Sequence, residues 1–300
     1  MGEIVAARGL SKVYGGLAAV DGVTFEVMAG EVFGLLGPNG AGKTTTLEIV
    51  EGLRQADSGE ASLLGENPWP RNEPLLRRIG VHLQTSSFFE RLTAREQIHT
   101  FAALYDVPAA RADAMLDRVG LADKAATRTE KLSGGQKQRL SIACTLVHDP
   151  EVVFLDEPTA SLDPQARRNL WDLLATLNDS GRTVVLTTHH LEEAEVLCDR
   201  VAVMDHGRII ETGSPAEMIR SLDAPMHVTV EGTELTRDEA ARLPGVEAVE
   251  VEGIALRMAT RDLAALLPAL AERDALAGLQ VRGATLEDVF LTLTGREYRT

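Results

Sequence analysis

The chain contains the stretch Gly37-Pro38-Asn39-Gly40-Ala41-Gly42-Lys43-Thr44-Thr45, which matches the phosphate-binding pattern G-x-x-x-x-G-K-[ST]. The apolar residues 31–36 before it predict a short strand, and residues 44–50 after it predict a helix. Glycines allow positive φ and a close approach of the backbone to an anion, and successive N–H groups at a helix N-terminus form a concave anion site. We therefore expect the whole stretch to hold a nucleoside triphosphate, with Lys43 at the β and γ phosphates and Thr44 at Mg²⁺.

The composition limits the class of protein. A chain of 300 residues with 44% hydrophobic and 25% charged residues is ordinary for a soluble globular protein of one large or two modest domains. No apolar run approaches the roughly 18 residues of a membrane span, and the first residues lack a long apolar secretory segment, so we expect a cytoplasmic location. The net charge of −15 argues against a surface that coats nucleic acid. The two cysteines, Cys144 and Cys198, are expected to be buried and reduced, neither ligating metal nor forming a disulfide.

A second candidate anion site lies in a segment whose apolar spacing is helical. Residues 93–148 place apolar side chains three or four positions apart, so we expect an all-helical insert between two strands of the sheet. The last helix of this insert begins at Ser133-Gly134-Gly135-Gln136, where Ser133 is a good N-cap and the glycines leave N–H groups free. This site has no lysine of its own, so its phosphate is expected to come from elsewhere.

Two carboxylates follow a strongly apolar strand, residues 152–155. An uninterrupted apolar run indicates a strand buried on both faces, and ligands of open α/β sheets bind at the carboxyl ends of such strands. We expect Asp156 to hold Mg²⁺ through water and Glu157 to act as a base on the attacking water. The next strand, residues 182–188, ends at His189-His190, either of which could contact a γ-phosphate. Chemistry alone leaves this choice open, because a strand points adjacent side chains to opposite faces.

Together these pieces resemble the ATP-binding subunit of ABC transporters over residues 1 to about 222, and the motifs stand in the family's order. The resemblance implies an α/β P-loop ATPase of the ABC type, with a parallel-sheet core, an antiparallel β subdomain and a helical subdomain of about 86–148. It also assigns roles to particular residues. These are Tyr14 as the adenine-stacking aromatic, residues 37–45 as Walker A, Gln84 as the Q-loop glutamine that senses Mg²⁺, residues 132–136 as the LSGGQ signature, Asp156 and Glu157 as Walker B with its catalytic glutamate, Asp163 of the D-loop Ser161-Leu162-Asp163, and His189 as the switch histidine.

The resemblance further implies a homodimer in which two ATPase domains pack head to tail. The Ser133-Gly134-Gly135 site of one chain would close on ATP held by Lys43 of the other, which accounts for an anion site without a lysine. Closure is then driven by ATP and relieved by its hydrolysis. Because the sequence shows no membrane span, a separate membrane permease would carry the substrate. Gln84 would couple the ATP site to that permease. The chain would then be a peripheral subunit at the cytoplasmic side of the membrane, and no nucleic acid is expected as a partner.

Two features resemble the family's exporters of drugs and polysaccharides, namely Asp57-Ser58-Gly59 and residues 187–195. The tail, residues 285–297, is similar to the C-terminal signature of the daunorubicin-resistance ATPases, although an amphipathic terminal helix would show the same apolar spacing. We therefore predict an ATPase that powers export of a drug or other small molecule. An importer ATPase is the nearer alternative. A non-transport ABC ATPase would need long coiled coils, zinc-binding cysteines or two cassettes, none of which the sequence contains.

Residues 223–300 are predicted to form a small accessory α+β domain after a linker at Asp223-Ala224-Pro225. Its strands are expected at 226–230, 246–251, 255–259 and 279–282, and its helices at 236–243, 261–273 and 285–294. The sequence of this segment contains no catalytic or metal-binding constellation, so we interpret it as regulatory or dimer-stabilising.

One further segment is a candidate contact with the permease. Phe88-Phe89 follow Gln84 in a polar loop, in a chain with only 4% aromatic residues. They are expected either to line a groove for a cytoplasmic helix of the permease or to fill the small core of the helical insert.

Overall fold

The computed structural model describes residues 2–83, 88–89, 91–160, 162–178, 181–232 and 234–295. Its internal contacts divide the chain into two units, with the boundary between Pro215 and Ala216. The sequence placed this boundary after residue 222, so the helix α8 (Pro215–Ser221) lies almost wholly in the second unit and not in the first. A turn-forming residue such as Pro225 can be recognised in the sequence as a sign of a linker. The sequence does not show to which of the two units the helix before that linker belongs.

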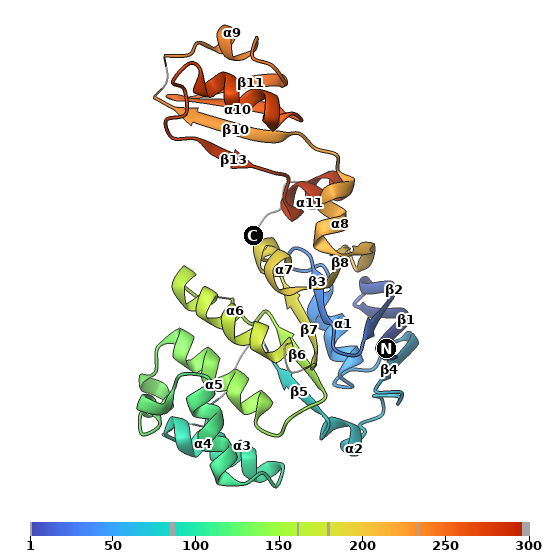
Figure 1. Ribbon diagram of the computed structural model, residues 1–300. Coiled ribbons are helices and arrows are strands. Elements are labelled where there is room, and N and C mark those ends of the chain that lie inside the picture. The colour runs from blue at the N-terminus through green and yellow to red at the C-terminus, as the bar shows by residue number, and fades with distance from the viewer. Residues whose placement is uncertain are drawn as a thin grey trace. The chain divides into compact units, whose positions relative to one another are not determined.

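The first unit is built on a six-stranded sheet (Figure 1). In spatial order its strands are β5 (Ile79–His82), β6 (Val152–Asp156), β7 (Thr183–Thr188), β3 (Val32–Leu36), β8 (Arg200–Asp205) and β9 (Arg208–Gly213). The strands from β5 to β8 run parallel, and β9 pairs antiparallel with β8 at the edge. All residues of β3, β6 and β7 are buried, which confirms the buried strand predicted ahead of Asp156.

A smaller antiparallel sheet covers part of the central one. Its strands are β2 (Leu17–Met28), β1 (Glu3–Tyr14) and β4 (Ser58–Leu63), in that spatial order. Gly15 and Gly16 form the turn that joins β1 to β2, and both have positive φ, 54° and 89°. The two sheets share one core, in which the rings of Phe25 and Phe33 stack with their centres 5.3 Å apart. The start of β2 lies against the phosphate loop that follows β3, because a Cβ on Gly42 would meet the carbonyl oxygen of Ala19.

Helices cover both faces of the central sheet. Successive side chains of a strand point to opposite faces, so a strand with every residue buried must be covered on both. Phe33 and Val185 share a core with Leu47 of α1 (Lys43–Val50) on one face. Their neighbours Val32 and Val184 point to the other face, where α6 (Pro164–Asn178) and α7 (Leu191–Leu197) pack. The phosphate loop therefore leads directly from a central strand into a helix that packs on the same sheet.

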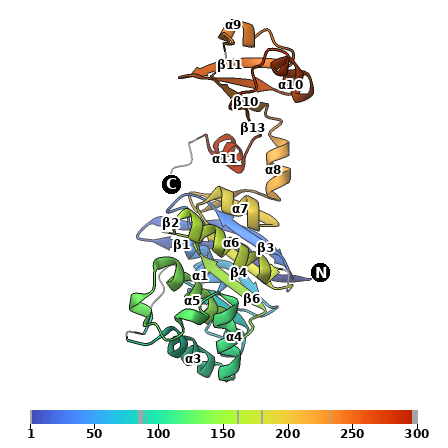
Figure 2. The ribbon, with the colours of Figure 1, turned by 60° about the vertical axis from the view of Figure 1, so that its left-hand side comes forward.

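The predicted all-helical insert between β5 and β6 is confirmed, and Figure 2 shows its helices grouped together. Capping boxes set two of the helix starts, one at Thr93 with Glu96 and one at Ser133 with Gln136. The elements are α3 (Ala94–Leu104), α4 (Ala109–Arg118), η1 (Ala122–Lys124), η2 (Thr129–Lys131) and α5 (Gly134–Leu146), after a short α2 (Glu73–Leu76) that precedes β5.

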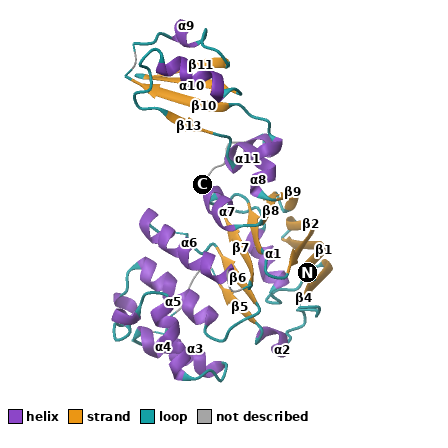
Figure 3. Cartoon of the chain, viewed as in Figure 1, coloured by secondary structure: helices purple, strands orange, loops and turns teal. Residues whose placement is uncertain are grey.

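The second unit contains the predicted strands and helices in the predicted order (Figure 3). Its elements after α8 are β10 (Met226–Glu231), α9 (Arg237–Ala240), β11 (Val246–Glu252), β12 (Ala255–Thr260), α10 (Leu263–Ala271), β13 (Gln280–Arg282) and α11 (Leu286–Thr294). The strands pair antiparallel in the order β11-β12-β10-β13, which is the split βαβ arrangement. Leu266 and Leu270 of α10 pack on one face of this sheet against Val228 and Met258.

The helix that follows the phosphate loop ends at a buried acid. Glu51 caps the C-terminus of α1 and is only 1% exposed, and its Oε1 has no hydrogen-bond partner among the described residues. Burial raises the pKa of Glu51 from its ordinary 4.5 to about 8, and the nearby charges of Asp156 and Glu48 add to the rise. The folded chain therefore keeps this proton at neutral pH, whereas the unfolded chain releases it.

We expect Glu51→Gln to remove a pH dependence of stability. Between about pH 4.5 and 8 the free energy of unfolding should fall as pH rises, by at most about 1.4 kcal/mol per pH unit, because the folded state binds more protons. Glutamine mimics the protonated acid, so the variant should gain stability over the native chain as pH rises from about 5 to 7.5. Urea unfolding at both pH values measures this, with the exposed Glu60→Gln as the matched control. Parallel pH profiles for the native chain and Glu51→Gln would contradict the expectation.

Candidate functional site

The predicted phosphate loop joins the end of β3 to the start of α1. Gly40 and Gly42 have positive φ, 82° and 101°, as the tight turn requires. A Cβ on Gly37 would lie 2.3 Å from the carbonyl oxygen of Met204, and one on Gly42 would lie 2.2 Å from that of Ala19. Only glycine fits at these two positions. No side chain caps the N-terminus of α1, so the N–H groups of its first turn remain for an anion.

Lys43 is folded back into this loop and is 4% exposed. Its Nζ donates hydrogen bonds to the carbonyl oxygens of Gly37, at 2.8 Å, and Pro38, at 3.2 Å. The same Nζ lies 3.3 Å from Oε1 of Glu157. Burial lowers the pKa of the Lys43 ammonium, whereas the neighbouring Glu157 carboxylate raises it. The acceptors that now surround the ammonium are ones that phosphate oxygens can replace.

Asp156 is the last residue of β6, and Glu157 is the first residue of the turn that follows it. The Thr44 hydroxyl donates to the Asp156 carboxylate at 3.1 and 3.2 Å, so the start of α1 and the end of β6 are in contact. Burial raises the pKa of Asp156, and the hydrogen bonds from Thr187 and Thr44 oppose this rise. In the described ranges, no three His, Cys, Asp or Glu side chains form a metal-binding group. A hydroxyl and one carboxylate instead suit Mg²⁺, which takes few protein ligands together with phosphate oxygens.

The structure distinguishes the two adjacent histidines. His189 places Nδ1 3.0 Å from Oε2 of Glu157. The His190 ring does not take part in this contact. It lies tilted against the His189 ring, with centres 4.1 Å apart, and burial followed by the neighbouring His189 lowers the pKa of His190 to about 4. The geometry therefore joins His189, and not His190, to the acid expected to activate water.

Tyr14 stands at the end of β1, and its side chain is 41% exposed. Arg54 places its guanidinium carbon 5.4 Å from the centre of the ring, and Lys12 places Nζ 5.8 Å from it. Two cations so close to an aromatic ring restrain its orientation. The exposed part of the ring remains available to stack on a purine.

The predicted second anion site is a separate cavity of ≈ 320 Å³ at the start of α5. Residues 133–136 line it together with Asp163, whose Oδ1 accepts a hydrogen bond from the N–H of Ala166 at 2.9 Å. A Cβ on Gly135 would come within 3.0 Å of the Cβ of Ala166, so a glycine here lets α5 and α6 approach closely. This cavity has no lining residue in common with the group formed by Lys43, Thr44, Asp156, Glu157 and His189.

Sequence reasoning missed two polar residues of this cavity. Arg139 and Asn169 line it, one on α5 and the other on α6. Arg139 stands four positions after Gly135, a spacing that places both on one side of a helix, so periodicity offered a signal for it. The cavity thus has a cation of its own, although not a lysine. Two residues named by the sequence prediction, Gln84 and Ser161, lie outside the described residues.

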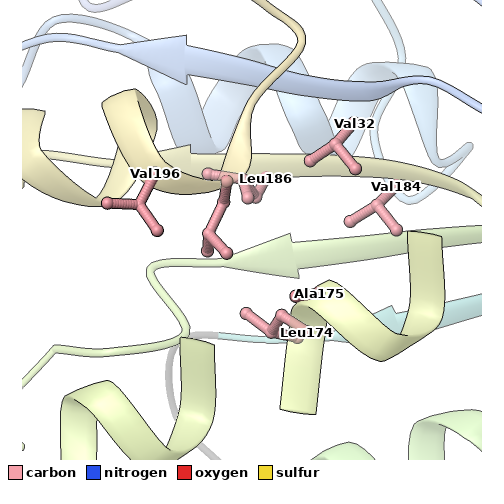
Figure 4. A pocket seen from close by; sticks show the side chains of 7 residues that line it. Val32, Leu174, Ala175, Val184, Leu186 and Val196 are labelled. Atoms are coloured by element: carbon pink, nitrogen blue, oxygen red, sulfur yellow. The ribbon is translucent and has the colours of Figure 1, made fainter. Parts of the chain in front are cut away.

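A second cavity, of ≈ 150 Å³, is apolar and lies away from the carboxylates (Figure 4). Figure 4 shows Val32, Val184 and Leu186 from the sheet facing Leu174 and Val196 of the two covering helices. Val32 and Val184 stand near the start of their strands, whereas Asp156 ends β6 and His189 directly follows β7. The candidate site lies at the carboxyl ends of these parallel strands, so this cavity, which begins near their amino ends, forms no part of it.

Comparison with known proteins agrees with this geometry. The family model described as ABC transporter matches residues 20–160. Nod factor export ATP-binding protein I of Ralstonia nicotianae is 42% identical over 305 residues, covering 99% of this chain and 95% of that protein. This chain belongs to the ABC transporter ATP-binding family. The protein of the same name from Paraburkholderia xenovorans is 43% identical and covers 96% of each chain.

Solved structures extend the likeness to the fold of this ABC ATPase. The structure of cbiO1 from Clostridium perfringens is 30% identical, with a TM-score of 0.67, over 74% of this chain and 95% of that one. A dimeric cassette in a post-hydrolysis state with ADP and Pi is 27% identical, with a TM-score of 0.64, over 70% of this chain and 98% of that one. The chain is accordingly an ATPase that couples ATP hydrolysis to transport. None of the described helices combines the length and hydrophobicity of a membrane span.

Proposed function

We propose that this ABC ATPase powers export through a separate membrane permease, which it binds as a peripheral subunit on the cytoplasmic side. The supporting observation is the extent of the match. The two relatives named for Nod factor export cover 99% and 96% of this chain, so they include the second unit as well as the cassette. Export is therefore favoured over import. Assignment to the daunorubicin-resistance group stays a prediction, since these relatives are named for another compound.

The proposal includes a homodimer in which each ATP is shared between two chains. Within one chain, the group around Lys43 and the cavity at Ser133 share no residue, so one chain supplies two different halves of a site. Head-to-tail pairing brings the halves together around two nucleotides, with the helix start of α5 and Arg139 facing the phosphates. The dimeric form of the related cassette bound to ADP and Pi supports this pairing.

In this proposal Thr44 and Asp156 would hold Mg²⁺, which when bound would supply positive charge beside the β and γ phosphates. Lys43 leaves Glu157 and donates to the phosphate oxygens. Glu157 then accepts a proton from the attacking water, and His189 holds the freed carboxylate from its other side through the 3.0 Å contact. Tyr14 stacks on the adenine.

Direction of transport can be measured in proteoliposomes. The tagged chain should retain an integral membrane protein when it is purified from detergent-solubilised membranes of its own cells. Liposomes that carry this complex with the ATPase outward are given MgATP and either a Nod factor or daunorubicin, which is fluorescent. Export predicts that one of these compounds accumulates inside the vesicles, and that Lys43→Ala abolishes the accumulation. ATP-dependent loss of a preloaded compound from the lumen would instead indicate import.

Phe89 is a specific candidate for the permease contact. Its side chain is 55% exposed, while its backbone N–H donates to Oε1 of the buried Gln97 at 3.1 Å. A loop anchored in this way presents the ring outward, which favours the docking hypothesis over a place in the core for Phe89. Phe88 is half-buried.

Phe89→Ala should lower recovery of the permease about tenfold, as expected for loss of a buried aromatic anchor, while basal ATPase activity and folding stay unchanged. The matched control is Ile210→Ala, which removes an apolar side chain of 39% exposure from β9. The measurement is quantitative pull-down from solubilised membranes. Equal recovery of the permease by both variants would show that Phe89 does not belong to the interface.

A further inference from the structure

Thr187, which stands two positions before His189, contacts both carboxylate residues, Asp156 and Glu157. Thr187 is fully buried at the end of β7, beside the end of β6. Its hydroxyl donates a short hydrogen bond to Oδ1 of Asp156 and accepts one from the backbone N–H of Glu157 at 3.0 Å. Its carbonyl oxygen also accepts from that N–H, at 3.2 Å. One residue therefore holds the side chain of Asp156 and the backbone of Glu157 at once.

The backbone held by these bonds is in an uncommon conformation. Glu157 has φ of 46°, in the left-handed region that residues other than glycine rarely adopt. Such a conformation persists only where the surroundings maintain it, and it is concentrated at functional sites. Here it separates the two carboxylates, since Asp156 faces Thr44 while Glu157 faces Lys43 and His189.

We propose that Thr187 is a positioning residue whose hydroxyl fixes the turn between Asp156 and Glu157. Its donor bond orients the Asp156 carboxylate toward Thr44, and its acceptor bond keeps Glu157 in the left-handed turn that points it at the nucleotide. This inference rests on the proposed roles of Asp156 at Mg²⁺ and of Glu157 at the attacking water. It adds a residue that does not itself touch substrate.

A merely structural role is the alternative, and the chain offers a matched control for it. Thr183 stands at the other end of β7, is 2% exposed, and its hydroxyl accepts from the N–H of Gly30 at 2.9 Å. Thr183→Val removes a buried hydroxyl from the same strand without touching the carboxylates. If the Thr187 hydroxyl only stabilised the strand, Thr183→Val and Thr187→Val should have the same effects.

The test compares Thr187→Val, Thr187→Ala, Thr187→Ser and Thr183→Val in the full chain. The Kd of a fluorescent ATP analogue is measured in EDTA and in Mg²⁺, together with kcat and with thermal unfolding. We expect Thr187→Val and Thr187→Ala to lower kcat about 10- to 100-fold, the loss expected for a hydrogen bond to a charged carboxylate. The gain in ATP affinity that Mg²⁺ provides should also shrink several-fold, with the Kd in EDTA unchanged. Thr187→Ser should restore both properties, and Thr183→Val should change neither.

Three results would overturn the proposed role of Thr187, and a further variant tests the Mg²⁺ site on which it rests. If Thr187→Val behaves as Thr183→Val does, or if Thr187→Ser is as impaired as Thr187→Val, the proposal is overturned. Misfolding of both Thr187→Val and Thr187→Ala, with Thr183→Val folded, would show a structural role and overturn it too. Asp156→Asn separates this failure from failure of the proposed Mg²⁺ site. If Asp156→Asn leaves the Mg²⁺ dependence of binding intact, the site itself is wrongly assigned.

Discussion

Lys43→Ala should abolish ATP hydrolysis, lowering kcat on the order of 10³-fold, because the charge that develops on the γ phosphate loses its nearest cation. Affinity for ATP should fall about 10- to 100-fold, the loss expected for a hydrogen bond to a charged group. The variant also leaves the buried Glu157 without the ammonium that now lies 3.3 Å from it. We therefore expect a lower free energy of unfolding as well. Isothermal titration with ATP, steady-state turnover and urea unfolding measure the three effects.

Lys124→Ala is the matched control for this experiment. Lys124 lies on η1 in the helical insert, is half-buried and pairs with the adjacent Asp123, so its removal changes the net charge equally without touching the loop. Ordinary turnover in purified Lys43→Ala would refute the assignment of residues 37–45 as the phosphate loop. Equal losses in Lys43→Ala and Lys124→Ala would show a charge effect with no connection to the site.

Glu157→Gln should separate ATP binding from hydrolysis. Glutamine cannot take a proton from water, so kcat should fall on the order of 10²- to 10⁴-fold. Binding should be as tight as in the native chain or tighter, because the competing carboxylate no longer holds Lys43 away from the phosphates. His189→Ala should also reduce turnover strongly, whereas His190→Ala should reduce it little, since His189 contacts the Glu157 carboxylate and the His190 ring lies against that of His189. Turnover and titration with MgATP check all three variants.

Glu192→Gln controls for the change in charge, since Glu192 is exposed on α7, a few residues beyond the histidines. Failure of Glu157→Gln to bind ATP would mean that Glu157 holds nucleotide and does not activate water. Equal losses in the two histidine variants would leave the choice of switch residue without support.

The phosphate loop and the carboxylates were predictable because their signals are local. The glycine spacing from Gly37 to Gly42 is a short pattern that can be recognised in the sequence, although these glycines are required by close contacts with the distant Met204 and Ala19. The apolar run before Asp156 directly reflects burial on both faces of a strand. The helical insert followed from helical spacing in the same way, whereas the antiparallel sheet was implied by the family resemblance. For the second unit the elements were predictable, but the order β11-β12-β10-β13 was not, because strand pairing there depends on contacts distant in sequence.

The remaining site residues depend on how separate elements meet. The chemistry of the residues could not choose between His189 and His190, because the choice depends on where β7 ends relative to β6, and only the family resemblance pointed to His189. Thr187 gave no signal at all, since a threonine in a β-strand is unremarkable by propensity. Its role is visible only once Asp156 and Glu157 lie beside it. Arg139 could have been found from its helical spacing to Gly135, although nothing in the sequence showed which face of α5 borders the cavity.

Light scattering of Glu157→Gln with and without MgATP tests most directly whether two chains share each nucleotide. The account predicts a monomer without nucleotide, a dimer with MgATP, and two ATP molecules per dimer. Gly134→Asp supplies the decisive comparison, because Gly134 is exposed, a Cβ there meets nothing within 4 Å, and the added carboxylate would repel the γ phosphate of the opposing chain. The double variant Glu157→Gln/Gly134→Asp should bind ATP as a monomer and fail to dimerise. A dimer that forms equally well in the double variant, or a Glu157→Gln protein that binds MgATP and stays monomeric, would contradict the shared site.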